Sequence, residues 1–216
     1  MRIVKKSFEL YKTHYKLVKE LEQEDDLISK IEAGLSSIFL ISQNLPKKDT
    51  TDFFSHEDFP LSECFEELET SYELMKLGFY KQSMISLRTA LDVGLLSIYW
   101  TIVGKESKIF IDWLNSRLNT PFKNDKFWKT IISDNYICLF DNKYKLVEEI
   151  KSITLSNYVH TKGFKYSNYS TTQRAMFGNI EKKEFDRWFN QFIKIIRIIE
   201  ILHLLRFPVT VNSTTR

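Results

Sequence analysis

Residues that interrupt regular backbone structure are scarce in this chain of 216 residues, which has 6 Gly and 4 Pro. An all-β protein of this length needs many turns and would usually carry more of both. Cysteine is scarcer still, because only Cys64 and Cys138 are present and neither belongs to a Cys-x-x-Cys pair or a Cys/His cluster. These absences argue against a disulfide scaffold and a structural zinc site, and we expect two reduced thiols.

Long apolar runs are missing as well. The most apolar segment, residues 195–205, is too short to span a bilayer and contains Arg197, Glu200 and His203. The N-terminal segment lacks the uninterrupted apolar stretch of a signal peptide. The formal net charge of +3 is too small to indicate nucleic acid by bulk electrostatics. Since no phosphate-binding glycine loop and no metal-ligand spacing occur, we expect a cytoplasmic protein without a membrane segment, cofactor or metal.

Helical periodicity is what the chain has in place of these features. Hydrophobic residues make up 43% and charged residues 27%, which are globular proportions. Apolar side chains recur every three or four residues from the start of the chain, at Val4, Phe8, Tyr11, Tyr15 and Val18. The same spacing, with caps and breakers, predicts further helices over residues 26–43, 62–77, 80–103, 108–118, 126–132, 143–159 and 182–207.

This pattern predicts an all-α, up-and-down helical bundle in a single domain. We expect residues 1–60 to form an N-terminal helical extension with a connecting loop, residues 61–207 the bundle, and residues 208–216 a flexible tail. Residues 161–180 break the helical pattern, and loops of this length are often functional. The final helix is apolar on nearly every face, so we expect it to be central or shared with a partner subunit in a homodimer.

Two blocks of the sequence resemble the HEPN superfamily. The first, residues 65–100, reads as a helix hairpin in which Gly78, Tyr80, Arg88, Ala90 and Asp92 take the places of the family's Gly-x-Tyr and Arg-x-Ala-x-Glu patterns, with Asp where Glu is commoner. The second, LSNYVHTKG at residues 155–163, is similar to the region of the family's Arg-x4-6-His signature. From the start of the first block to the end of the second, the resemblance spans about 100 residues. The resemblance implies a helical bundle, often dimeric and often acting on RNA.

His160 is the residue that this resemblance would make catalytic. In the family's nucleases a His assists the attack of a ribose 2′-hydroxyl on the adjacent phosphate, and an Arg on the same helix belongs to the signature. Here the four positions at 153–156 hold Ile, Thr, Leu and Ser, so the chain departs from the signature at its Arg. The cation would then come from Arg88, Lys162 or Lys165, while Ser156 and Asn157 add a small polar face beside His160.

Simpler readings of these residues stay open. His160 also suits the C-terminal end of a helix that is capped by Gly163, where the helix dipole favours a cation. Arg88 and Asp92 stand four residues apart and can pair with each other. His203 lies in the apolar final helix, where we expect a histidine with satisfied hydrogen bonds in the core or at an interface and not a catalyst.

The segment after His160 interleaves cations with tyrosines. Cations neutralise phosphates and tyrosines stack on unpaired bases, so this mixture suits single-stranded RNA, although it also suits a protein partner. The candidate contact residues are Lys162, Lys165, Tyr166, Tyr169 and Arg174.

Three functional readings follow. The first is a divergent HEPN-like protein that binds RNA or a partner protein, such as an antitoxin, in a bacterial stress or defence setting that the resemblance alone supplies. The second is a metal-independent endoribonuclease with His160 as the acid-base group. The third is a purely structural or partner-binding bundle.

Overall fold

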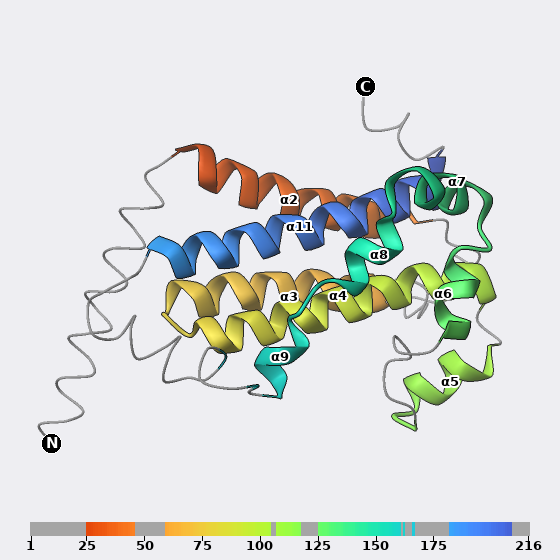
Figure 1. The fold of residues 1–216 in the computed structure, drawn as a ribbon, viewed down its shortest axis with the longest axis horizontal. Helices are drawn as coiled ribbons and strands as arrows, with labels where there is room; N and C mark the ends of the chain where they lie inside the picture. Colours follow the sequence, from red (N-terminus) through yellow and green to blue (C-terminus); the bar gives the residue numbers. More distant parts are fainter. Residues whose placement is uncertain are drawn as a thin grey trace, which may run out of the picture.

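The computed structural model describes residues 25–45, 59–104, 107–117, 125–160, 162, 166 and 182–208, and over these ranges the regular structure is helical, without a strand. Figure 1 shows the long helices packed side by side, with shorter helices along one face and at one end. The helices are α2 (Asp25–Asn44), α3 (Phe59–Lys76), α4 (Tyr80–Val103), α5 (Lys108–Leu114), α6 (Asp125–Ile131), α7 (Asn135–Tyr144), α8 (Leu146–Lys151), α9 (Ser156–Val159) and α11 (Lys182–Arg206). The prediction of an all-α helical bundle is confirmed.

The α3–α4 hairpin is the framework of the bundle, and its turn is set by Gly78. This residue adopts φ 80°, a left-handed conformation that glycine reaches without steric cost. Its N–H donates to the Met75 carbonyl at 2.8 Å, and the Phe79 N–H donates to the Leu74 carbonyl at 2.8 Å. This pair of bonds is the Schellman motif, which satisfies the last carbonyls of α3 and reverses the chain. The predicted hairpin is therefore present, with Gly78 ending its first helix.

Serines join the two arms of this hairpin inside the core. The Ser71 hydroxyl donates to the Ser83 carbonyl at 3.0 Å, and the Ser83 hydroxyl donates to the Ser71 carbonyl at 2.7 Å. The indole N–H of Trp188 in α11 donates to the Ser71 hydroxyl at 3.0 Å. These bonds are buried, so they satisfy polar groups that would otherwise oppose folding and they also fix α11 against the hairpin.

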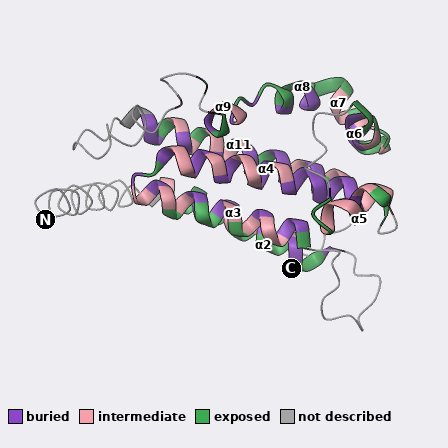
Figure 2. Cartoon of the chain, turned by 90° about the horizontal axis from the view of Figure 1, so that it is seen from below, coloured by how far each residue is buried: buried purple, intermediate pink, exposed green. Residues whose placement is uncertain are grey.

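Helix α11 packs against α2, α3, α4 and α7, and α4 likewise packs against four other helices. Purple buried positions run along it and along α4 in Figure 2. Two glycines permit the close packing: a Cβ on Gly34 would lie 2.8 Å from Ile196 Cδ1, and one on Gly94 would lie 2.7 Å from Ile199 Cδ1. Because α2 packs against both α11 and α3, residues 25–44 add a fourth long helix to the bundle. The domain boundary at residue 60 stays a prediction.

Most of the predicted helices are confirmed, among them residues 26–43, 80–103, 126–132 and 182–207. The first helix of the hairpin begins at Phe59 and not at Ser62, because Pro60 is accommodated in a first turn, where its missing N–H is not needed. The helix predicted to reach residue 118 ends at Leu114, followed by Asn115 as its C-cap and Ser116 at φ 56°. The periodic helix predicted at residues 4–18 and the tail at 209–216 lie outside the described residues.

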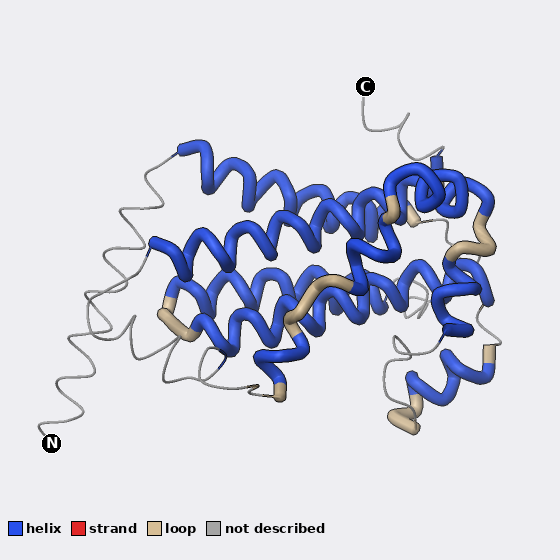
Figure 3. The backbone as a smooth tube through the Cα atoms, viewed as in Figure 1, coloured by secondary structure: helices blue, strands red, loops and turns tan. Residues whose placement is uncertain are grey.

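The single helix predicted over residues 143–159 was wrong. Figure 3 shows separate coils there, which are the end of α7, then α8 and α9. Lys145 adopts φ 56°, which ends α7, and its N–H donates to the Asp141 carbonyl at 2.8 Å. The Asp141 carboxylate then accepts from the Val147 N–H at 2.7 Å and so caps α8. A side-chain cap thus compensates for the unfavourable left-handed backbone of a lysine.

Buried polar groups in the core are few. His203 is 1% exposed, its Nε2 lies 3.1 Å from Ser97 Oγ, and its Nδ1 lies 2.8 Å from the Ile199 carbonyl oxygen. The prediction that His203 is a satisfied core residue is confirmed.

None of the described helices combines the length and the apolar character needed to cross a membrane.

Candidate functional site around α9

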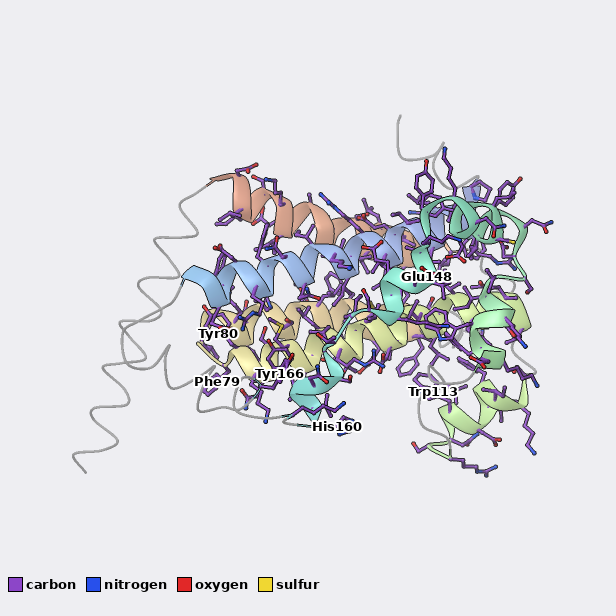
Figure 4. The ribbon with its side chains drawn as sticks, viewed as in Figure 1. Phe79, Tyr80, Trp113, Glu148, His160 and Tyr166 are labelled. Atoms are coloured by element: carbon purple, nitrogen blue, oxygen red, sulfur yellow. The ribbon has the colours of Figure 1, made fainter. Side chains whose placement is uncertain are left out.

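Helix α9 consists of four residues and packs against α4, which brings the two sequence blocks of the HEPN resemblance together (Figure 4). Such a short helix is not stable by itself, so its position depends on tertiary contacts. Leu155 and Tyr158 supply these contacts, since both side chains are buried. The backbone closes the end of the helix through bonds from the His160 N–H to the Ser156 carbonyl at 3.2 Å and from the Lys162 N–H to the Asn157 carbonyl at 3.0 Å.

His160 lies in solvent just after α9, as its C-cap residue. Figure 4 shows it at the outer tip of the helix, directed away from the long helices. Ser156 and Asn157 are half-buried in the same turn, and the small polar face expected beside the imidazole stays a prediction. The ring is accessible to a ligand and is not part of the packed interior.

Arg88 and Asp92 form the predicted pair within α4. Arg88 Nη2 lies 2.7 Å from Asp92 Oδ1, and both side chains are largely buried, with 22% and 14% of their surfaces exposed. This ion pair is confirmed as a structural feature. The guanidinium of Arg88 is therefore already engaged by a carboxylate of its own helix.

Another guanidinium, which the sequence analysis did not single out, approaches α9 from α11. Arg187 Nη1 donates to both carboxylate oxygens of Glu184, at 2.8 and 2.7 Å. Arg187 also interacts with the buried Tyr158 hydroxyl through a hydrogen bond. Burial raises the pKa of Tyr158, while Arg187 opposes this shift through its charge and its hydrogen bond.

The Glu184 carboxylate is itself nearly buried, so the ion pair with Arg187 offsets part of the cost of removing it from water. Burial, followed by the negative charges of Glu184 and Asp186, raises the pKa of Tyr80 at the start of α4. The charge of Glu184 thus acts on Tyr80 of α4 and on Tyr158 of α9, while Arg187 pairs with this carboxylate directly.

The tyrosine and lysine candidates of the following segment are described only in part. Tyr166 packs edge-on against Tyr158, with ring centroids 5.0 Å apart, and is half-buried. Lys162 is exposed. Lys165, Tyr169 and Arg174 lie outside the described residues. The structure thus brings Tyr166, Lys162 and His160 to one short stretch of surface around α9.

No signal in the sequence pointed to Arg187 as a neighbour of α9. Glu184 and Arg187 stand three residues apart, which predicts their pairing on one helix face but not the contact with Tyr158. That contact joins residues 158 and 187, which are 29 positions apart in the sequence. It depends on how α9 folds back onto the bundle, which local spacing does not encode.

Metal chemistry has no anchor in the part of the chain that the structure describes, because no group of three or more His, Cys, Asp or Glu side chains there is placed to hold an ion. The fold and this site define a helical bundle with an accessible histidine and lysine on a docked short helix. No protein-family model matches the chain, and neither the curated proteins nor the solved structures contain a match to it.

Proposed function

We propose that this protein is a divergent HEPN-like RNA-binding module whose contact surface is the α9 surface, defined by His160, Lys162 and Tyr166. The main support is the packing of α9 on α4, which joins the two distant sequence blocks on which the HEPN resemblance rests. The bacterial stress or defence setting is part of the same proposal and comes from that resemblance.

The chemistry of the α9 surface fits single-stranded RNA. Lys162 is exposed and offers an ammonium group to phosphate, while Tyr166 offers an aromatic ring near it. Phe79, 38% exposed in the hairpin turn, lies at the same end of the bundle (Figure 4) and adds a second ring on which a base can stack. The Arg187–Tyr158 contact keeps the backbone of α9 in place, so these groups are positioned before RNA arrives.

Fluorescence anisotropy with a labelled single-stranded RNA tests the proposal. We expect binding that weakens steeply with salt, because phosphate contacts release counterions. Lys162→Glu should weaken binding and lower the log–log salt slope by about 0.7, the value for one phosphate contact on a single strand. Lys129→Glu is the matched control, since Lys129 is an exposed lysine on α6, at the other end of the bundle. Equal binding by both variants, or no binding of RNA at low salt, refutes the proposal.

RNA cleavage is a second candidate, favoured by the exposure of His160. The imidazole would take the proton of a ribose 2′-hydroxyl, whose oxygen then bonds to the adjacent phosphorus while the bond to the 5′-oxygen breaks. The leaving 5′-oxygen would take a proton from water and the imidazolium would return its proton to water, so the products would be a 2′,3′-cyclic phosphate and a 5′-hydroxyl. Lys162 is the cation nearest to His160 in the sequence, two residues after it. It would stabilise the negative charge that develops on the phosphate oxygens.

The cleavage candidate predicts that purified protein cuts RNA in excess EDTA and that His160→Ala abolishes the cut. Circular dichroism should show unchanged helicity in that variant, because His160 is exposed. Cutting that persists in His160→Ala eliminates this candidate but does not contradict the proposal that the protein binds RNA. A stable protein complex from the native host, in the absence of RNA binding, would favour the partner-binding alternative.

A further inference from the structure

An outward stripe on α11, defined by Ile193, Arg197, Glu200 and Leu204, is partly open to solvent. Ile193 and Ile201 are half-buried, while Arg197 and Leu204 are exposed. A groove of about 700 Å³ lies along α11 residues 189–201, and residues of α2 and α8 also line it. Branched apolar side chains that stay partly in water along a groove are typical of a surface that binds another helix.

The charges in this groove separate into paired and available ones. Lys194 pairs with Glu149 of α8 at 3.1 Å, and Lys30 pairs with Asp26 within α2. Arg197 and Glu200 also line the groove, and no ion pair joins either of them to another described residue. One positive and one negative side chain are thus left for an external partner on the same stripe.

The order of side chains along the stripe is self-complementary when reversed. Ile193, Arg197, Glu200 and Leu204 follow one another at spacings of four, three and four residues. A two-fold axis midway between Arg197 and Glu200 places each Arg197 opposite the Glu200 of a second copy. The same axis places each Ile193 opposite a Leu204, because Ile193 lies four residues before Arg197 and Leu204 lies four residues after Glu200.

From this order we infer that two copies of the chain associate through antiparallel α11 helices, with the two stripes facing each other. A parallel pairing would set Arg197 against Arg197 and Glu200 against Glu200, and like charges in contact oppose association. The spacing of three and four residues is also the seam along which two helices pack. The occupant of the groove is therefore a second copy, held by two Arg–Glu pairs between flanking apolar contacts. This inference does not depend on RNA binding.

Charge reversal in the full-length chain tests this pairing by sedimentation velocity over a range of concentrations, without RNA. Arg197→Glu and Glu200→Arg each set like charges against each other twice, so each should weaken dimerisation on the order of 100-fold. The double variant R197E/E200R restores opposite charges and should restore the dimer. Lys129→Glu, at an exposed position on α6, should leave the dimer unchanged. A monomeric wild type, single variants that still dimerise, or a double variant that stays monomeric overturns the inference.

A disulfide test fixes the register and does not depend on the stability of the charge variants. In a Cys138→Ser background, I193C/L204C should form a cross-link between two chains under mild oxidation. Neither single cysteine variant should do so, because positions 193 and 204 are about 16 Å apart along a helix and each cysteine would face an apolar residue. Efficient cross-linking by either single variant, or none by the double variant, contradicts the antiparallel register.

Discussion

Replacing His203 with glutamine should flatten the acid side of the stability profile of this protein. The imidazole is fully enclosed between α11 and α4, and desolvation by burial lowers its pKa to about 4 from the ordinary value of 6.5, although its bond to the Ile199 carbonyl acts in the opposite direction. Since the carbonyl accepts from Nδ1–H, the neutral ring accepts the Ser97 hydroxyl at Nε2. Protonation of Nε2 would remove the acceptor of the Ser97 hydroxyl and would place a positive charge in the core.

The direction of the pH effect follows from the two pKa values. Because the folded-state pKa lies below the unfolded one, the unfolded chain binds more protons between about pH 4 and pH 6.5. Stability from this group is therefore complete above the unfolded pKa and is lost as the pH falls through that window. The full shift corresponds to about 3 kcal/mol, of which about 2 kcal/mol is lost on going from pH 8 to pH 5.

Urea unfolding followed by far-UV circular dichroism at about pH 8 and about pH 5 measures this loss. The wild type should lose about 2 kcal/mol more than His203→Gln between the two conditions, because other titrating groups contribute equally to both chains. Ser97→Ala is the matched control, since it removes the hydroxyl partner but keeps a buried imidazole and should retain the steeper slope. Equal pH slopes for the wild type and His203→Gln would refute the argument that His203 is held neutral by burial.

Three further substitutions test the packing described above. Tyr158→Phe removes the hydroxyl that Arg187 contacts and should cost about 1 kcal/mol, with faster hydrogen exchange in α9. Gly94→Ala places a methyl group 2.7 Å from Ile199 Cδ1, and thermal unfolding should show a loss of about 1–3 kcal/mol. Asp134→Ala removes the N-cap of α7, and a loss of about 1–2 kcal/mol in urea unfolding is expected. Unchanged exchange in α9, or an unchanged unfolding midpoint for either of the other two variants, would contradict the corresponding contact.

The amino-acid sequence alone determined those features of the fold that depend on neighbours along the chain. Residues 80–103 were predicted to be a helix with its observed bounds, because Gly78 and Gly104 end regular structure on either side. The Arg88–Asp92 pair follows from a spacing of four residues on one helix, which the helix geometry converts into contact. His203 was placed in the core because the helix around it is apolar on nearly every face.

Tertiary structure alone decided how residues 135–160 are divided and what α9 touches. The left-handed backbone at Lys145 is unfavourable for a lysine, and the Asp141 cap on Val147 compensates for it only once the chain has turned. In the same way, Arg187 of α11 acts on Tyr158 because α9 is folded back onto the bundle, where it packs against α4. Periodicity records which face of a helix is apolar, but the partner of a buried hydroxyl or guanidinium is set by segments that meet in three dimensions.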